Sequence, residues 1–197
     1  MKTIIIMISG HGSNMLAIAK EVKFGKLKEI CKIQAVFSNR EDAGGLQKAS
    51  ELGILTHVIT SKGNKRICYN SLLLDWLRSQ NPDYIILAGY MKILSPEVIR
   101  EFPGRIINIH PADTTEHQGL HGYEWAWENK LETTKVTVHF VDEGLDTGEI
   151  IGQKTVDLTD VNSLEEVEKL GLKDEHEFYS ECLRKVLTGK DGKTQKD

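Results

Sequence analysis

An asparagine and a histidine stand two residues apart at the end of an apolar run, in the sequence Asn108-Ile109-His110-Pro111. If that run is a strand, its period of two places Asn108 and His110 on the same side. An amide beside an imidazole can stabilise a developing oxyanion while the imidazole handles a proton. A structural histidine is the simpler interpretation, but the neighbouring amide and the position at a strand end favour a catalytic pair.

Asp146 is the third candidate, because it lies between Gly144 and Gly148 in the segment DEGLDTG. A carboxylate within hydrogen-bonding distance of an imidazole favours the protonated ring and fixes its tautomer. Taken alone, the segment is more typical of a hairpin turn, where Asp and Gly are common.

A glycine-containing segment, SGHGSN at residues 9–14, joins an apolar run to a helical stretch. Glycines let the backbone approach an anion closely, and the free N–H groups at a helix start favour negative charge. A dinucleotide motif would need glycine where Met15 stands, and the Gly-Lys-Ser/Thr of a P-loop is absent. The segment predicts either a site for one small anion, such as a sugar monophosphate, or a tight turn capped by Ser13 or Asn14.

Two more histidines, His117 and His121, lie in a polar loop at residues 112–121. With His110 they could suggest a metal site, but their spacing matches no common metal motif. We therefore expect a mobile loop near the substrate, and no metal.

The overall composition excludes several classes of protein. The net charge of −4 argues against a general nucleic-acid binder. The longest apolar run, residues 4–8, is too short to cross a membrane or to form the core of a signal peptide. The three cysteines show no CxxC spacing, which argues against a disulfide framework or a cysteine-based zinc site. We expect a cytoplasmic protein with neither nucleic acid nor membrane as a partner.

Short apolar runs alternate with amphipathic stretches in the first half of the chain. The expected strands are residues 3–8, 33–37, 55–59, 84–88 and 105–109, and the expected helices are residues 14–24, 43–52 and 65–79. This alternation predicts βαβ crossovers and an α/β fold with a doubly wound, mostly parallel, Rossmann-like open sheet.

The second half of the chain has a different rhythm. Residues 136–141 and 149–156 predict antiparallel additions to the sheet, and residues 164–187 predict a helix. We expect one catalytic domain over residues 1–188 and a disordered polar tail over residues 189–197. Binding groups should lie in the loops that follow the parallel strands.

The chain resembles the glycinamide ribonucleotide formyltransferases in five segments that occur in order: SGHGSN, AGYMKILSPEVI, GRIINIHPA, HQGLHG and VTVHFVDEGLDTGEII. The resemblance extends from residue 2 to about residue 185. It implies transfer of a formyl group from 10-formyltetrahydrofolate, as cosubstrate, to the amine of 5′-phosphoribosylglycinamide in purine biosynthesis. It also implies that Asn108, His110 and Asp146 are the catalytic residues, and that protonated His110 and Asn108 hold the oxyanion.

The same resemblance implies binding residues. Gly12, Ser13 and Asn14 would bind the substrate phosphate, while Glu175, with Lys173 nearby, would bind the ribose–glycinamide part. The implied folate-binding residues are Arg66, Met91, Lys92, Ile93, Leu94, Asn108, Asp142, Glu143, Gly144, Leu145 and Asp146.

The chain departs from the family pattern in the loop after His-Pro. The usual Ser-Leu-Leu-Pro is Ala112-Asp113-Thr114-Thr115 here, and a usual glycine is Lys135. These exchanges replace apolar anchors by polar groups and put the behaviour of the loop and the choice of formyl donor in question.

Three other functions stay open at this stage. One is a formyltetrahydrofolate hydrolase, which releases formate to water. Another is a non-catalytic module that binds folate or a phosphosugar. The third is a nicotinamide oxidoreductase, which Met15 disfavours. The composition does not choose between a monomer and a homodimer.

Overall fold

The computed structural model describes residues 1–189 of the 197-residue chain. The predicted disordered tail therefore lies, apart from Gly189, outside the described residues. The chain forms two compact units, residues 1–107 and the part from residue 108 onward. The single domain expected over residues 1–188 stays a prediction.

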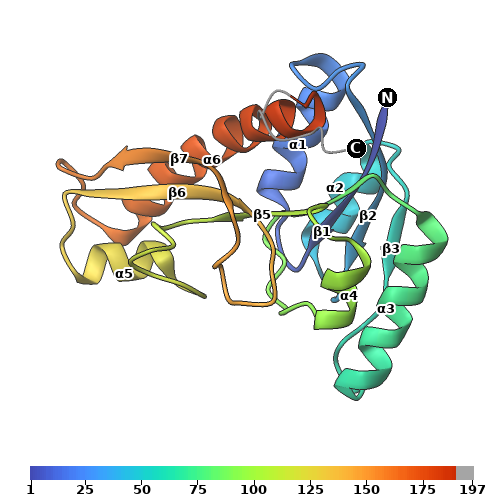
Figure 1. Cartoon of the computed structure of the whole chain (residues 1–197). Coiled ribbons are helices and arrows are strands. Elements are labelled where there is room, and N and C mark those ends of the chain that lie inside the picture. The colour runs from blue at the N-terminus through green and yellow to red at the C-terminus, as the bar shows by residue number, and fades with distance from the viewer. Residues whose placement is uncertain (190–197) are drawn as a thin grey trace. The chain divides into compact units, whose positions relative to one another are not determined.

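The first unit alternates strands and helices along the chain (Figure 1). Its elements are β1 (Lys2–Ile8), α1 (Ser13–Phe24), β2 (Cys31–Ser38), α2 (Gly44–Glu51), β3 (Thr56–Val58), α3 (Arg66–Gln80), β4 (Tyr84–Leu87), α4 (Pro96–Glu101) and the start of β5 (Ile106–His110). Strand β1 pairs in parallel with both β2 and β4, and β2 pairs in parallel with β3. The predicted parallel βαβ arrangement is confirmed.

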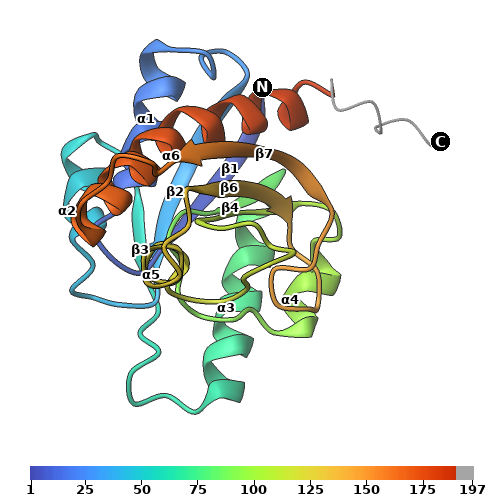
Figure 2. The same cartoon turned by 90° about the vertical axis from the view of Figure 1, so that its left-hand side faces the viewer.

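The core of this unit is centred on β1. The side chains from Ile4 to Ile8 are all fully buried. A strand with neighbours on both edges and helices over both faces has no solvated side, so every position is apolar. Helix α1 packs beside α2, and α3 packs beside α4. Figure 2 shows these two pairs on opposite sides of the strands, as right-handed crossovers require.

The second unit continues from the end of β5. Its other elements are α5 (Gly122–Glu128), β6 (Thr133–Phe140), β7 (Ile150–Asp157) and α6 (Leu164–Leu187). Strands β6 and β7 are antiparallel, and α6 packs along both of them (Figures 1 and 2). Gly152 of β7 leaves room for Phe178 and Cys182 of α6, whose side chains lie where a Cβ on this residue would point.

The strand order is β3-β2-β1-β4-β5-β6-β7, with β5 shared by both units. The sheet is mostly parallel and has its antiparallel pair at the C-terminal end, as the sequence predicts. The expected strands and helices of the first half are present with ends shifted by no more than two residues, whereas β6 begins three residues earlier than expected.

Helices α4 and α5 are not predicted by the periodicity of the sequence. They have 6 and 7 residues, which is too short for a helical period to become visible. The local signals for the start of α4 are Ser95 at the N-cap, Pro96 at the first helical position and Glu97 in the first turn.

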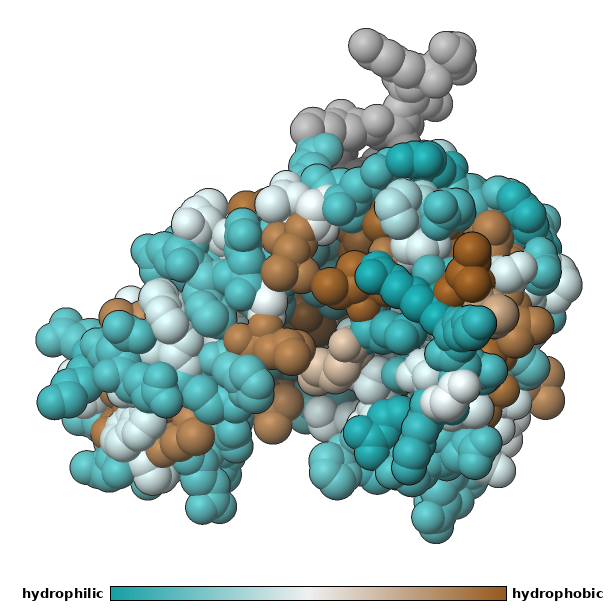
Figure 3. Space-filling model, turned by 90° about the horizontal axis from the view of Figure 1, so that it is seen from below, coloured by the Kyte–Doolittle hydropathy of each residue, from teal (hydrophilic) through white to brown (hydrophobic). Residues whose placement is uncertain are grey.

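Apolar side chains also reach the surface, as Figure 3 shows for one face of the molecule. The exposed large apolar residues include Met91 and Ile93 in the first unit and Leu120 and Leu145 in the second. Within residues 1–189, no helix has both the length and the apolar character needed to cross a membrane.

Candidate active site

Strand β5 ends with two polar side chains. Asn108 is half-buried and His110 is 3% exposed, and Pro111 follows where the chain leaves the sheet. Because residues two apart on a strand share a face, both side chains lie on the same side of β5.

Asp146 meets both side chains from the segment that follows β6. Its Oδ1 accepts a hydrogen bond from Nδ2 of Asn108 at 3.3 Å, and its Oδ2 is 3.5 Å from Nδ1 of His110. The carboxylate is only 12% exposed. The structure thus brings together the three side chains that the sequence analysis identifies as catalytic candidates.

A fourth polar side chain, His139 of β6, completes this cluster. Its Nδ1 donates to the carbonyl oxygen of Phe140 at 2.8 Å, which leaves Nε2 as an acceptor for Nδ2 of Asn108 at 3.3 Å. Nε2 is also 3.5 Å from Oδ1 of Asp146. Both amide hydrogens of Asn108 therefore have protein acceptors. The sequence analysis did not identify His139, whose signal is an isolated polar residue in the apolar run VTVHFV.

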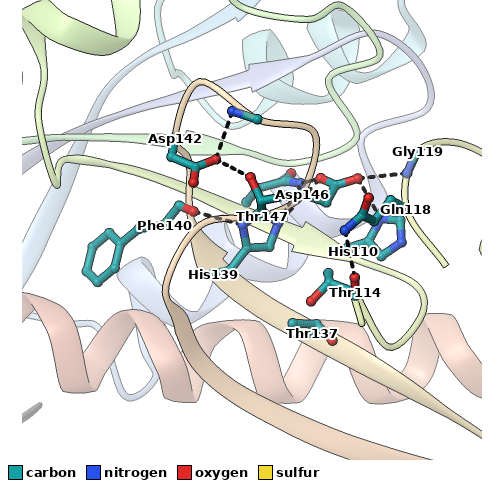
Figure 4. Close-up of polar contacts among 12 residues, drawn as sticks. His110, Thr114, Gln118, Gly119, Thr137, His139, Phe140, Asp142, Asp146 and Thr147 are labelled. Atoms are coloured by element: carbon teal, nitrogen blue, oxygen red, sulfur yellow. Dashed lines mark hydrogen bonds and ion pairs between the residues drawn. The ribbon is translucent and has the colours of Figure 1, made fainter. Parts of the chain in front are cut away.

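The loop 112–121 contributes backbone groups to the same cluster (Figure 4). The N–H of Gly119 donates to Oδ2 of Asp146 at 2.9 Å. The carbonyl oxygen of His117 lies 3.0 Å from Nε2 of His110, so this ring nitrogen carries the proton and donates. The loop therefore contacts both members of the imidazole–carboxylate pair.

The two loop histidines differ in their contacts with the cluster. The ring of His117 stacks on that of Trp125 with 5.0 Å between centroids and on that of His110 with 6.3 Å, and its Nε2 donates to the carbonyl oxygen of Leu120. His121 is exposed, and its Nδ1 lies 2.7 Å from a carboxylate oxygen of Glu124. The predicted mobility of this loop stays a prediction.

The two ionisable members of the pair have shifted pKa values. Burial lowers the pKa of His110, and although Asp146 and the His117 carbonyl raise it, the net pKa stays below its ordinary value. Burial raises the pKa of Asp146, but contacts with His139, the Gly119 N–H and His110 lower it by a larger amount. The net pKa of Asp146 therefore lies below its ordinary value. In the free protein at neutral pH, Asp146 is therefore ionised and His110 neutral. The protonated ring expected when His110 holds the oxyanion stays a prediction.

In the first unit, Ser9 joins the loops that follow three parallel strands. Its N–H donates to the Gly89 carbonyl at 2.9 Å, and its Oγ donates to Oδ1 of Asn39 at 2.6 Å. The same Oγ accepts from the N–H of Met91 at 2.8 Å. Strand β1 lies between β2 and β4, where the strand order reverses, and this is the position at which open α/β sheets bind ligands.

Gly12 determines how α1 begins. It has a φ of 71°, and a Cβ on it would lie 2.8 Å from the Cα of Gly45. Both the dihedral and the close approach require glycine. Gly12 is itself the N-cap residue and there is no side-chain capping bond, so the alternative in which Ser13 or Asn14 caps the helix is wrong.

The remaining predicted folate-binding residues of the first unit differ in exposure. Met91 and Ile93 are exposed, whereas Leu94 is buried. The ammonium group of Lys92 lies 4.8 Å from the centre of the Tyr69 ring. Arg66 is the first residue of α3 and is exposed.

The predicted folate-binding segment of the second unit, residues 142–146, is an exposed turn apart from Asp146. Asp142 accepts hydrogen bonds from the N–H of Gly144 and from Oγ1 of Thr147 (Figure 4). Glu143 and Leu145 lie in the same turn and are exposed.

The predicted ribose-binding residues, Lys173 and Glu175, lie on α6. Glu175 is only 5% exposed, and its Oε1 accepts a hydrogen bond from the hydroxyl of Tyr123. A Cβ on Gly171 would lie 2.1 Å from Cζ of Tyr123, so the glycine makes room for that ring. Among residues 1–189 there is no group of three or more His, Cys, Asp or Glu side chains suited to a metal ion.

Known proteins are similar to this chain over nearly its whole length. A family model described as formyl transferase matches residues 2–183. Phosphoribosylglycinamide formyltransferase of Escherichia coli K12 is 38% identical over 177 residues, which cover 89% of this chain and 82% of the relative.

Solved structures are similar over the same length. Glycinamide ribonucleotide transformylase 1 from Symbiobacterium toebii has a TM-score of 0.90 and 32% identity, covering 96% of this chain and 89% of that one. Phosphoribosylglycinamide formyltransferase from Bacillus halodurans has a TM-score of 0.90 and 30% identity, covering 99% and 100%. With a family model that spans both units and relatives alike in sequence and fold, the chain belongs to the formyl transferase family.

Proposed function

We propose that this chain transfers a formyl group from 10-formyltetrahydrofolate to the amine of 5′-phosphoribosylglycinamide, a step of de novo purine biosynthesis in the cytoplasm. Relatives named phosphoribosylglycinamide formyltransferase match nearly its whole length. The observation that carries the proposal is the contact of Asp146 with both Asn108 and His110, because acyl transfer to an amine needs oxyanion donors and a proton acceptor rather than a protein nucleophile.

In this proposal the oxyanion forms at the hydrogen-bond donor of His110. Its Nε2–H points at an oxygen atom, the carbonyl of His117, at 3.0 Å. When the amine attacks the formyl carbon, a C–N bond forms and the formyl oxygen becomes negative. This oxygen shares the Nε2–H with the His117 carbonyl, and the amide of Asn108 turns from its protein acceptors to donate to it.

Asp146 supports the proton transfers. The charge that develops on the oxygen favours a protonated ring, and a proton on Nδ1 of His110 would face Oδ2 of Asp146. The attacking amine loses one proton through water to the carboxylate. The oxyanion then re-forms the carbonyl of the new formamide while the bond to N10 of the folate breaks. N10 takes the same proton back from the carboxylate through water, so Asp146 is ionised again at the end.

The binding roles are part of the same proposal and rest on the sequence resemblance. Gly12, Ser13 and Asn14 bind the phosphate, and Lys173 and Glu175 bind the ribose–glycinamide part. The folate contacts Arg66, residues 91–94 and residues 142–146.

A formyl-transfer assay tests the proposal. Phosphoribosylglycinamide is incubated with the chain and either 10-formyltetrahydrofolate or formate plus ATP, and the formylated ribotide is quantified. We expect product with the folate donor only. Formate release without the ribotide would indicate a hydrolase instead, and binding of both ligands without transfer would indicate a binding module.

A further inference from the structure

On one face of β6, His139 belongs to the candidate catalytic cluster, and neighbouring side chains bind the start of the loop 112–121. Lys135, Thr137 and His139 alternate along the strand and therefore point to the same side. His139 contacts Asn108 and Asp146, as described above. The other two side chains, with Gln153 of the paired strand β7, bind the start of the loop; these three residues are called the loop anchor.

The loop anchor holds the first two residues of the loop. Nζ of Lys135 lies 2.6 Å from Oδ2 of Asp113, and Nε2 of Gln153 donates to Oδ1 of Asp113 at 3.1 Å. Oγ1 of Thr137 donates to the carbonyl oxygen of Ala112 at 2.7 Å. Nε2 of Gln153 also donates to Oγ1 of Thr137, so the contacts form one connected network.

Asp113 in turn fixes the backbone of the loop as far as His117 through hydrogen bonds. Its carboxylate accepts from the N–H and the Oγ1 of Thr115, which closes a tight turn. Its backbone carbonyl accepts from the N–H groups of Glu116 and His117, at 3.0 and 2.9 Å. The same His117 presents its own carbonyl to His110, and two residues later Gly119 donates to Asp146.

The two charged side chains of the Lys135–Asp113 pair differ strongly in exposure. The Asp113 side chain is 8% exposed, whereas that of Lys135 is 41% exposed. Burial raises the pKa of Asp113, but Lys135, Thr115 and Gln153 together hold that pKa well below its usual value, so the carboxylate is ionised. A buried carboxylate that loses its cation is strongly destabilised, while an exposed ammonium that loses its partner is solvated. Loss of Lys135 should therefore disturb the loop more than loss of the Asp113 charge.

We propose that Asp113 and Lys135 are positioning residues for formyl transfer, because they fix the loop whose backbone groups hold the side chains of His110 and Asp146 in place. The inference rests on the proposed function for its kinetic consequence, but its structural part does not. Neither residue touches the reacting atoms; each acts through the His117 carbonyl and the Gly119 N–H.

The test compares Lys135→Met with Lys135→Arg and with the double variant Lys135→Met/Asp113→Asn. We expect Lys135→Met to lower kcat roughly 10- to 100-fold, the range that a small displacement of catalytic groups can cost, with an unchanged KM for phosphoribosylglycinamide. Lys135→Arg should restore kcat because it restores the cation. The double variant should recover part of it, because a neutral amide needs no counterion.

A spectroscopic measurement separates positioning from mere stability. The ring ¹⁵N shifts of His110 should show one fixed Nε2–H tautomer in the unmodified chain and an averaged pattern in Lys135→Met. The matched control is Lys154→Met, which removes a comparable ion pair with Asp174 on α6 and should change neither kcat nor the ring pattern.

Wild-type kcat and an unchanged ring pattern in Lys135→Met would overturn the inference, as would an equal loss of kcat in Lys154→Met. Lack of formyl transfer by the unmodified chain would instead contradict the proposed function. The ring measurement needs no turnover, so it would still decide whether the anchor positions His110.

Discussion

At the scale of single residues, the carboxylate of Asp146 is the most sensitive group in the cluster. Replacement by Asn preserves its shape, but the new amide must place an NH₂ group against a donor, either the Asn108 amide or the Gly119 N–H. We expect Asp146→Asn to lower kcat by about 10² to 10³. Steady-state kinetics checks this, with circular dichroism to verify the fold.

The control for this variant is Asp157→Asn. Asp157 is also a carboxylate that accepts from neighbouring groups, in this case the N–H and Oγ1 of Thr159, but it lies at the exposed end of β7. It should retain full activity. If Asp146→Asn works as fast as this control, the proposed mechanism fails.

His110 also links stability to pH. Its folded pKa lies below the ordinary value of 6.5, so between those two values the unfolded chain binds more protons than the folded one. Stability from the buried neutral ring is therefore present above pH 6.5 and is lost as the pH falls through this window. We expect urea unfolding at pH 7 and pH 5.5 to show that acid lowers the unfolding free energy of His110→Gln less than that of the unmodified chain.

His57, whose pKa burial also lowers, changes the unfolding free energy in the same direction and remains in both proteins. An equal loss in both would show that His110 is not responsible.

At the scale of elements, the close approach of α1 to α2 depends on Gly12. Gly12→Ala forces a Cβ into a left-handed backbone, at a cost of about 1–2 kcal/mol, and also against the Cα of Gly45 at 2.8 Å. We expect a loss of unfolding free energy above that range and a raised KM for phosphoribosylglycinamide.

Gly53→Ala is the matched control, because Gly53 has a φ of 73° but no atom within 4 Å of the added Cβ. Gly53→Ala should lose only the unfolding free energy that the backbone strain costs, with an unchanged KM for phosphoribosylglycinamide. Denaturant titration and substrate kinetics on both variants distinguish the two effects. Equal destabilisation by the two substitutions would mean that the contact with Gly45 relaxes at no cost.

Local sequence patterns predict the long elements better than the short ones. The unbroken apolar run of β1 and the long amphipathic period of α6 identify these elements almost to the residue, because burial on both faces or along one stripe leaves a direct record in the sequence. Helix α5 leaves no such record, since its start at Gly122 follows His121 in a left-handed conformation that composition does not reveal.

At the scale of the whole molecule, the convergence of the site depends on the order of strands in space. The spacing of Asn108 and His110 predicts their shared face, but Asp146 is 38 residues from Asn108 and meets it through the position of β6. The family resemblance supplied that partner, and spacing alone did not. His139 was missed for the same reason, because a polar residue inside an apolar run shows its role only once its neighbouring strand is known.

The contacts between Lys135 and Asp113 also limit how segments can be exchanged between members of the family. The loop and strand β6 work as one module, although 22 residues separate the two charges. A chimaera that grafts a foreign loop onto this scaffold would leave an orphaned lysine, and the reverse graft would bury a lone acid. Transplantation should therefore succeed only when both segments travel together.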